Sequence, residues 1–408
     1  MTSTSIHGAA QVLRPPEDGL PFLRHDRAGE LRLDPGSVSL RDDVIAALDD
    51  DPGAGVRVDA GGCTLVPGLV DAHTHLPFAG WRAEEYARKL AGDSYEEIAR
   101  SGGGIAASAR AFAAASDAEV LAQAGGLAAE MLQAGTTMFE TKSGYGLSVE
   151  GELRALALAA RLAAEVDQTV ASTALLAHAL PAGYEPDGWL DAVEAMLGAV
   201  KAEALDIYVE SIAFTNAHLE RMGALAREHG LALRSHVEQF ATHRSVPVAL
   251  AAGARSVDHL ACLHPDDLAP LAAAECAAVL LPGAEFLGAE RVAPGRSLAD
   301  AGAICVLATD ANPGTSPVTS LPLVIGLAAR RYGWSAREAL LAVTLNAAWT
   351  LGRSDRLGSI EAGKRADLVL LDGPVEQIAY RFGRNPVAAT FVAGVPVHVR
   401  PDAGWRFT

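Results

Sequence analysis

The hydrophobic positions of this chain form short apolar runs separated by longer segments of helical period. Eight runs rich in apolar and β-branched residues occur, and they are LVPGLVDAH (65–73), TTMFETKS (136–143), ASTALLAH (171–178), ALDIYVES (204–211), LALRSH (231–236), ARSVDH (254–259), AAVLLPG (277–283) and AICVLATD (303–310). Segments between them, such as VEGELRALALAARLAAEV, repeat apolar residues with the period of an amphipathic helix. The alternation predicts an α/β fold, a TIM-like (β/α)8 barrel with eight parallel strands.

The segments that flank this alternation contain strand-like runs without helical period. Residues 25–63 carry short β-prone pieces broken by Gly, Pro and Asp, and residues 357–400 contain GSIEAGKRADLVLLD and TFVAGVPVHV. Because each piece is small, we expect the two ends of the chain to pair in one sheet. The sequence therefore predicts a β-rich subdomain of residues 1–64 and 357–408 beside a barrel of residues 65–356. The first 24 residues are too irregular to assign to an element.

Composition and charge fit a globular chain and exclude few functions. The 408 residues are half apolar without a run of 18 apolar residues, which predicts a large core and no membrane span. A formal charge of -17 disfavours nucleic acid and means that an anionic substrate needs local cations. The four cysteines are isolated, which predicts free buried thiols. The N-terminus lacks the pattern of a signal peptide, so we expect a cytoplasmic protein.

Four residues that bind transition metals follow the predicted strands. His73 and His75 come at the end of the first run, His236 ends the fifth and Asp310 ends the eighth. The two histidines of the first run are two positions apart, so their side chains point the same way. The carboxyl ends of barrel strands meet at one rim, where such ligands form an open site that activates water. The pattern therefore predicts a metal-dependent hydrolase.

His259 ends the sixth run, next to the fifth in the predicted ring. If the four ligands hold the metal, His259 is free to exchange protons with the bound water or to polarise the carbonyl under attack. The alternative is a core imidazole that caps a barrel strand. Asp310 can also take part in catalysis, because a carboxylate bound through one oxygen can accept the proton of water with the other.

Ten motifs of this chain resemble the amidohydrolase superfamily and, within it, the imidazolonepropionase family. They are PGLVDAHTHLPFAGWRAEEY, SGGGI, FETKSGYGL, LLAHALP, HVEQ, SVDHL, LLPGAEF, ATDANPGTSP, TLNAAWTLG and GSIEAGKRADLVLLD. SGGGI, KSGYGL and TDANPGTSP are specific to the family, and the resemblance covers about residues 58–390. It implies hydrolysis of the cyclic amide C–N bond of 4-imidazolone-5-propanoate to N-formimidoyl-L-glutamate in histidine degradation, by a hydroxide on a single metal ion. It also implies a homodimer.

The resemblance assigns substrate contacts at several positions of this chain. Arg82 matches the family's carboxylate-binding arginine, and a guanidinium offers two parallel donors to a carboxylate. Tyr145 matches a substrate contact, and His178 matches a residue that hydrogen-bonds the carbonyl side of the substrate. Taken alone, the arginine is as typical of a solvated helix start, the GYG triplet of a turn, and the histidine of a structural imidazole.

The loop after the eighth run also matches substrate-binding positions of the family. Asn312, Gly314 and Thr315 correspond to positions that bind the substrate or product carboxylate, and we expect backbone N–H groups and a hydroxyl to form an anion cradle. Gln239 lies where relatives carry Glu or Gln, and a neutral amide can bind the ring but cannot act as general base. Glu238 is a weaker candidate, because we expect its side chain to point away from the His236 face. Acid and base roles therefore fall to His259 and Asp310, with His178 or His259 stabilising the oxyanion.

The metal content and the alternatives follow from the same residues. Many superfamily members bridge two metals with a carboxylated lysine at the tip of strand four, but here that run ends in residues 208–211, and Lys142 belongs to the second run. We expect one divalent ion, zinc or iron, because three imidazoles and a carboxylate accept both. Two other functions stay open. One is another cyclic amidohydrolase or aminoimidazole-type deaminase with the same metal site, and the other is a catalytically silent metal-binding barrel with a scaffolding role.

Overall fold

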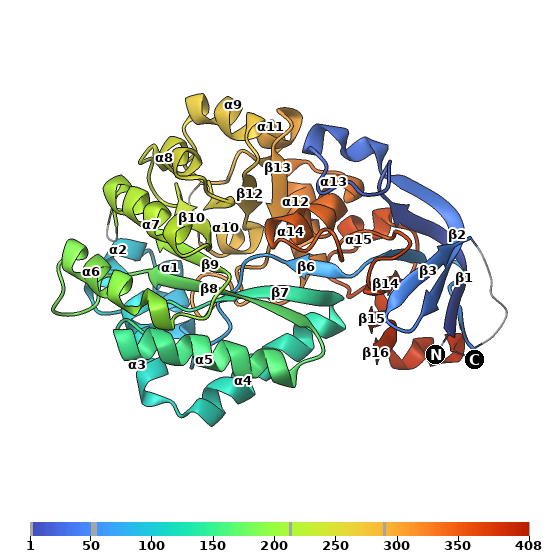
Figure 1. The fold of residues 1–408 in the computed structure, drawn as a ribbon, viewed down its shortest axis with the longest axis horizontal. Coiled ribbons are helices and arrows are strands. Elements are labelled where there is room, and N and C mark those ends of the chain that lie inside the picture. The colour runs from blue at the N-terminus through green and yellow to red at the C-terminus, as the bar shows by residue number, and fades with distance from the viewer. Residues whose placement is uncertain (1–2, 50–54, 212–213, 289–290, 408) are drawn as a thin grey trace.

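The computed structural model describes residues 3–49, 55–211, 214–288 and 291–407 (Figure 1). Its central feature is a sheet of eight strands arranged in chain order, each parallel to its neighbour. The strands are β6 (Leu69–Asp71), β7 (Thr136–Lys142), β8 (Thr169–Ala177), β9 (Ala204–Tyr208), β10 (Ala232–Val237), β11 (Ser256–His259), β12 (Ala277–Leu280) and β13 (Ile304–Leu307). The predicted (β/α)8 barrel is confirmed.

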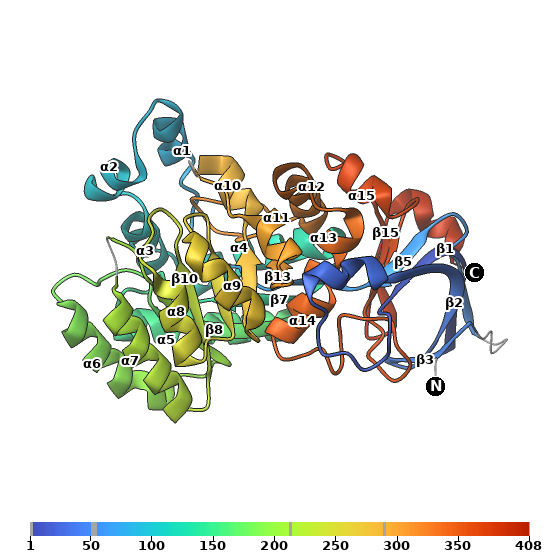
Figure 2. The same cartoon turned by 90° about the horizontal axis from the view of Figure 1, so that it is seen from above.

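Helices connect consecutive strands and cover the outside of the barrel (Figures 1 and 2). Before β13 they are α1 (Ala83–Leu90), α2 (Tyr95–Arg100), α3 (Ile105–Ala114), α4 (Asp117–Gln133), α5 (Val149–Glu165), α6 (Pro186–Met196), α7 (Asn216–Glu228), α8 (Ser245–Ala252), α9 (Pro265–Ala273), α10 (Pro282–Gly288) and α11 (Gly295–Asp300). After β13 they are α12 (Leu321–Tyr332), α13 (Ala336–Ala342), α14 (Leu345–Thr350) and α15 (Glu376–Tyr380). Short 3-10 helices span His25–Glu30, Leu197–Ala199 and Pro401–Arg406. Within the described ranges, no helix has the length and apolar character that a bilayer crossing requires.

The ring of strands is closed by the segments that follow β6 and β13. The N–H of Asp310 donates to the carbonyl of His73 at 3.0 Å, and the N–H of His75 donates to the carbonyl of Ala311 at 2.9 Å. Thr74 and Ala311 form an isolated parallel bridge at the same point. This pairing brings residues more than 230 positions apart in sequence to one rim of the barrel.

The second sheet combines both ends of the chain and lies beside the barrel, to the right in Figures 1 and 2. Its strand order is β16-β15-β14-β5-β1-β2-β3, and β4 pairs with β1. The strands are β1 (Ser3–Arg14), β2 (Arg32–Arg41), β3 (Val44–Leu48), β4 (Val56–Asp59), β5 (Thr64–Pro67), β14 (Leu368–Leu371), β15 (Val387–Val392) and β16 (Val395–Val399). Of the predicted subdomain, residues 1–2, 50–54 and 408 lie outside the described residues, and its boundaries stay a prediction.

The structure differs from the sequence prediction at two places near this sheet. The first predicted run, 65–73, is divided, because β5 pairs with β1 and β14 and only β6 enters the barrel. Gly68 allows this passage, since a Cβ there would stand 2.1 Å from Oγ1 of Thr137. The unassigned N-terminal segment contains β1, which pairs with three other strands. Register shifts within β1 interrupt the simple alternation by which such a strand is recognised.

Candidate active site

Three imidazoles meet at the rim where the ring of strands closes. His73 and His75 follow β6, and His236 lies within β10. One ligand nitrogen from each lies within 4.8 Å of the others, and all three side chains are buried. The Nε2 atoms of His73 and His75 are 3.3 Å apart. This is the convergence that the HxH pattern and the strand ends predict.

Asp310 lies against the same group. Its Oδ1 is 3.5 Å from Nε2 of His73 and 3.4 Å from Nε2 of His75. Asp310 has a φ of +53°, a conformation that L residues rarely adopt and that is frequent at functional sites. Burial raises the pKa of its carboxyl, an effect that the nearby imidazoles of His259 and His236 reduce.

Two buried carboxylates that the sequence analysis missed orient these imidazoles. Oδ2 of Asp258 accepts a hydrogen bond from Nδ1 of His73 at 2.6 Å, and Oδ1 of Asp206 accepts one from Nδ1 of His236 at 3.1 Å. With the proton on Nδ1, each ring presents the lone pair of Nε2, which is the usual arrangement behind a metal ligand. The sequence signal for these two residues is an aspartate inside a predicted buried strand, as in ALDIY and SVDH. A buried carboxylate needs a hydrogen-bond or charge partner, so such an aspartate indicates a pairing.

The donor set fits a divalent metal ion. Nε2 of His236 is buried and has no hydrogen-bond partner among the described residues. A buried polar atom without a partner is costly unless something else binds it. Three neutral imidazoles and one carboxylate form the ligand set of an open metal site. The residues that would hold the ion are His73, His75, His236 and Asp310.

A cavity adjoins this group and is lined by most of the predicted site residues. Its lining includes His75, Arg82, Ile105, Tyr145, His178, Tyr208, His236, Gln239, His259, Asp310, Asn312 and Thr315. Of the predicted site residues, only His73 and Gly314 do not line it. Tyr208 is an addition that no motif indicated, and Ile105 is the last residue of the SGGGI motif, to which no role was assigned.

Arg82 enters the cavity from the N-terminal end of α1, where it is the residue before the first turn. Its backbone N–H donates to the carbonyl of Pro313 at 2.9 Å. Nε and Nη1 of its guanidinium are buried and have no hydrogen-bond partner among the described residues. Glu85 is the nearest acid, with an oxygen 3.8 Å from Nε. Arg82 therefore lines the cavity and retains two buried donors that no described residue uses.

The loop after Asp310 is arranged differently from the predicted anion cradle. Oδ1 of Asn312 accepts the backbone N–H groups of Gly314 and Thr315 at 2.9 Å and 2.7 Å. Since these donors are already used, the expectation that backbone N–H groups of this loop bind a carboxylate is wrong for this structure. Gly314 serves instead as a surface for Arg82, because a Cβ at 314 would stand 1.6 Å from Nη2 of the guanidinium.

His178 and Tyr145 form one wall of the cavity. The ring of His178 stacks on the ring of His75 with centroids 5.5 Å apart. The ring centroid of Tyr145 lies 5.4 Å from that of His178. Nδ1 of His178 lies 2.9 Å from the carbonyl oxygen of Gly144, so it is the nitrogen that donates. Burial, and then the charges of His75 and His236, lower the pKa of His178 well below its usual value. Neutral His178 therefore has an accepting Nε2.

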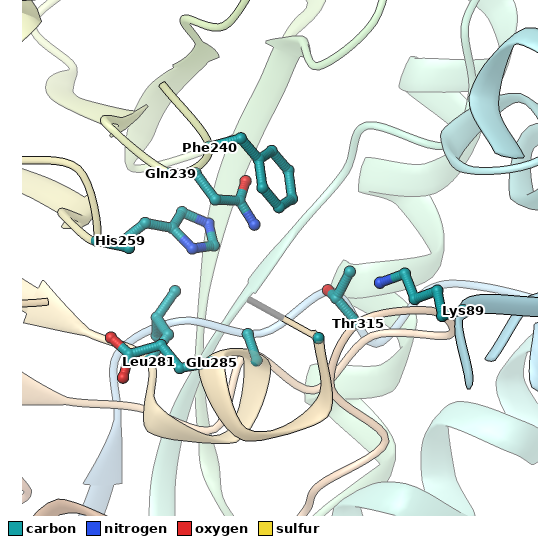
Figure 3. A pocket seen from close by; sticks show the side chains of 10 residues that line it. Lys89, Gln239, Phe240, His259, Leu281, Glu285 and Thr315 are labelled. Carbon is teal, nitrogen blue, oxygen red and sulfur yellow. The ribbon is translucent and has the colours of Figure 1, made fainter. Parts of the chain in front are cut away.

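His259 and Gln239 face a second, adjoining cavity, with Thr315 and Lys89 on its other side (Figure 3). His259 has a φ of +80° at the end of β11. Burial lowers the pKa of His259 to about 3, although the charge of Asp310 opposes this effect. Its imidazole is therefore neutral at neutral pH.

Glu238 points away from the three histidines, although simple alternation would place it on the face of His236, because β10 ends at Val237 and Glu238 has a φ of +55°. Its carboxylate accepts the backbone N–H groups of His243 at 3.0 Å and Ser245 at 2.7 Å. These bonds fix the loop and the first turn of α8. Glu238 is therefore a structural residue of the loop.

Comparison with known sequences agrees with this geometry. The amidohydrolase family model matches residues 64–397. An imidazolonepropionase of Cupriavidus necator is 43% identical over 370 residues, which covers 88% of each chain. One from Rubrobacter xylanophilus is 41% identical and covers 96% of this chain and 98% of its own. The chain belongs to the imidazolonepropionase family of amidohydrolases. The family resemblance found in the sequence motifs is thereby confirmed.

Solved structures share the fold of this family member at low sequence identity. An adenosine deaminase from Xanthomonas campestris with bound zinc superposes with a TM-score of 0.72 at 22% identity, covering 98% of this chain and 93% of its own. The guanine deaminase of E. coli superposes with a TM-score of 0.67 at 15% identity, covering 98% and 100%. These likenesses support the barrel with its second sheet as the fold.

Proposed function

We propose that this chain hydrolyses the ring amide of 4-imidazolone-5-propanoate to N-formimidoyl-L-glutamate, a step of histidine degradation. One observation carries the proposal: His75 and His236 of the three-histidine group line the same small cavity as Arg82. The substrate needs a cation beside its propionate and a Lewis acid beside its ring carbonyl. Arg82 supplies the cation, and a metal ion on the three histidines and Asp310 would supply the Lewis acid. The 41–43% identity to imidazolonepropionases supports this choice over other cyclic amides.

One divalent ion, zinc or ferrous iron, completes the site. His73, His75, His236 and Asp310 would hold it, and when bound it would lower the pKa of water to about 7 and polarise the carbonyl. A single ion is supported by the tip of β9, which ends in Tyr208 and carries Val209 and Glu210 beyond it. That position would have to supply a lysine to bridge two metals.

Arg82 binds the propionate of the substrate. Arg82 lines the cavity together with Thr315, and two of its nitrogens have no partner among the described residues. A guanidinium binds a carboxylate through parallel hydrogen bonds. Lys89 adds a second positive charge at the adjoining cavity. These local cations attract an anionic substrate to a chain whose formal charge is -17.

His178, Tyr145 and Gln239 orient the planar ring. Because Nδ1 of His178 donates to Gly144, its Nε2 accepts a hydrogen bond from a ring N–H. This differs from the expected contact with the substrate carbonyl, since an accepting nitrogen cannot bind an accepting oxygen. The amide of Gln239 and the phenol of Tyr145 complete the set with groups that do not titrate near neutral pH.

His259 and Asp310 manage the proton. In the reaction, the oxygen of water bonds to the ring carbonyl carbon, the C–N bond breaks, and the ring nitrogen leaves with a proton. His259, which lines the same cavity as Asp310, accepts a proton from the attacking water and delivers it to the leaving nitrogen, while Asp310 is the alternative acceptor. Placing both groups beside the metal ligands allows one proton to pass without leaving the site.

The reaction takes place in the cytoplasm under this proposal. All four cysteines, Cys63, Cys262, Cys276 and Cys305, are free and buried. Free thiols are usual where the compartment is reducing. The homodimer implied by the family stays a prediction.

Assay of the purified chain with 4-imidazolone-5-propanoate tests the proposal. Turnover is followed by the loss of substrate ultraviolet absorbance, in protein as purified, stripped with a chelator, and reloaded with Zn²⁺ or Fe²⁺. We expect activity that disappears on stripping and returns with one ion per chain. Ammonia release from an aminoimidazole without ring opening would support the deaminase instead, and metal binding without turnover would support the scaffolding role.

A further inference from the structure

A buried ammonium lies directly behind the metal ligands. Lys142 at the end of β7 is 0% exposed. Its Nζ is 2.8 Å from Oε1 of Glu140, 2.9 Å from Oδ2 of Asp206 and 3.9 Å from Oδ2 of Asp258. Burial alone would lower the pKa of this lysine, but Asp206 and Glu140 raise it above its usual value. Lys142 therefore remains a cation among three acids.

Two of these acids are the carboxylates that bind the metal-ligand imidazoles. Asp206 uses Oδ1 for His236 and Oδ2 for Lys142. Asp258 directs Oδ2 toward both His73 and Lys142. One ammonium thus connects the outer partners of two ligands that come from different strands. The connection runs from β7 through β9 and β11 to the ligands beside β6 and in β10.

The third acid fixes the position of this ammonium. Oε1 of Glu140 binds Lys142, while Oε2 accepts the backbone N–H of Thr74 at 3.2 Å. Thr74 lies between His73 and His75, and its hydroxyl donates to the carbonyl of Glu140 at 2.7 Å. Glu140 therefore ties Lys142 to the segment that carries the HxH pair.

We propose that Lys142 is a positioning residue of the metal centre, holding Asp206 and Asp258 so that the imidazoles of His236 and His73 aim at one ion. The inference rests on the proposed metal-dependent function and extends it to a residue without contact to substrate. Without the ammonium, two carboxylates of 0% exposure lose a cation that lies between them. They would turn or shift, and the imidazoles bonded to them would follow.

The metal affinity of Lys142→Met tests this inference, because a residue that only neutralised charge would change stability without changing the ligands. Lys364→Met is the matched control, since Lys364 is also buried, pairs with Glu361 at 2.9 Å, and belongs to the loop before β14. Affinity for Zn²⁺ is measured by competition with a chelator, and thermal midpoints are measured with and without the ion. Visible absorption of the Co²⁺-loaded protein reports the ligand geometry.

We expect Lys142→Met to weaken Zn²⁺ binding roughly 10- to 100-fold and to alter the Co²⁺ spectrum. Lys364→Met should lower the thermal midpoint but keep the affinity. If Lys142→Met does not fold, the double variant Glu140→Gln/Lys142→Met, which keeps the net charge of the cluster, decides the question. Wild-type affinity and spectrum in a folded Lys142 variant would overturn the inference. Absence of Zn²⁺ binding by the wild-type chain would instead overturn the proposed function.

Discussion

Gly314 lies so close to the guanidinium of Arg82 that a Cβ at position 314 would stand 1.6 Å from Nη2 and 2.1 Å from the central carbon. The two residues come from different loops, one before α1 and one after β13. Their contact places the cation in the cavity beside the metal ligands. If Arg82 binds the substrate carboxylate as proposed, that binding requires the absence of a side chain at 314.

Gly314→Ala should raise KM at least tenfold, because the added methyl displaces Arg82 from the cavity. The affinity for Zn²⁺ should not change, since no metal ligand lies among the atoms nearest to that Cβ. Steady-state kinetics and chelator competition measure the two effects. Gly188→Ala in α6 is the control, because a Cβ there meets no atom within 4 Å. An unchanged KM in Gly314→Ala would contradict this account of the loop.

Arg82→Met should raise KM by roughly 10- to 150-fold, the cost of one hydrogen-bonded charge of about 1.5–3 kcal/mol. An analogue with an ethyl group in place of the propionate should be turned over equally slowly by the wild type and the variant. The control is Arg88→Met, on the same helix, whose guanidinium pairs with Asp93 at 2.7 Å. If Arg82→Met weakens both compounds alike, Arg82 does not bind the carboxylate.

His259→Asn should lower kcat by about 10²- to 10⁴-fold, the usual contribution of a general acid or base, and leave the metal content at one ion per chain. The reason is that His259 lines the cavity but is not part of the three-histidine group. His236→Ala should lose the metal itself. Metal analysis beside kinetics separates the two, and loss of the ion in His259→Asn would show that His259 is a ligand.

His25→Phe should make the metal-free protein less sensitive to acid. His25 is fully buried against Trp334 with ring centroids 4.3 Å apart, and burial lowers its pKa to about 3. Below the unfolded pKa of about 6.5 only the unfolded chain gains this proton, so stability falls as pH drops from about 6.5 toward 3. The difference is about 2 kcal/mol between pH 6.5 and pH 5.

Thermal midpoints at pH 7 and pH 5 measure this difference. The midpoint of the wild type should fall further than that of His25→Phe over this interval. His229→Phe, at an exposed position after α7, should behave as the wild type. Equal losses in all three proteins would mean that His25 takes no part in acid sensitivity.

The sequence predicted the barrel and the ends of its strands because period and composition are local properties. His73, His75, His236 and Asp310 could be grouped because parallel strands place their carboxyl ends at one rim. The division of the first run could not be predicted, since β5 and β6 differ only in the strands they pair with. That pairing depends on residues 300 positions away.

The parts of the site that the sequence did not reveal depend on side-chain partners. The donors of Gly314 and Thr315 bind Asn312, and no local pattern distinguishes this from a cradle open to a ligand. Asp206 and Lys142 were visible as charges in buried runs, but their pairing crosses from β9 to β7. Because a buried charge needs a partner, Asp206 and Lys142 could each have been expected to pair with an opposite charge.

An anomalous diffraction experiment at the zinc or iron absorption edge tests the central claim most directly. In crystals of metal-loaded protein, we expect one peak about 2.0–2.2 Å from ring nitrogens of His73, His75 and His236 and an oxygen of Asp310. No peak at these residues, in protein that contains one ion per chain, would contradict the account.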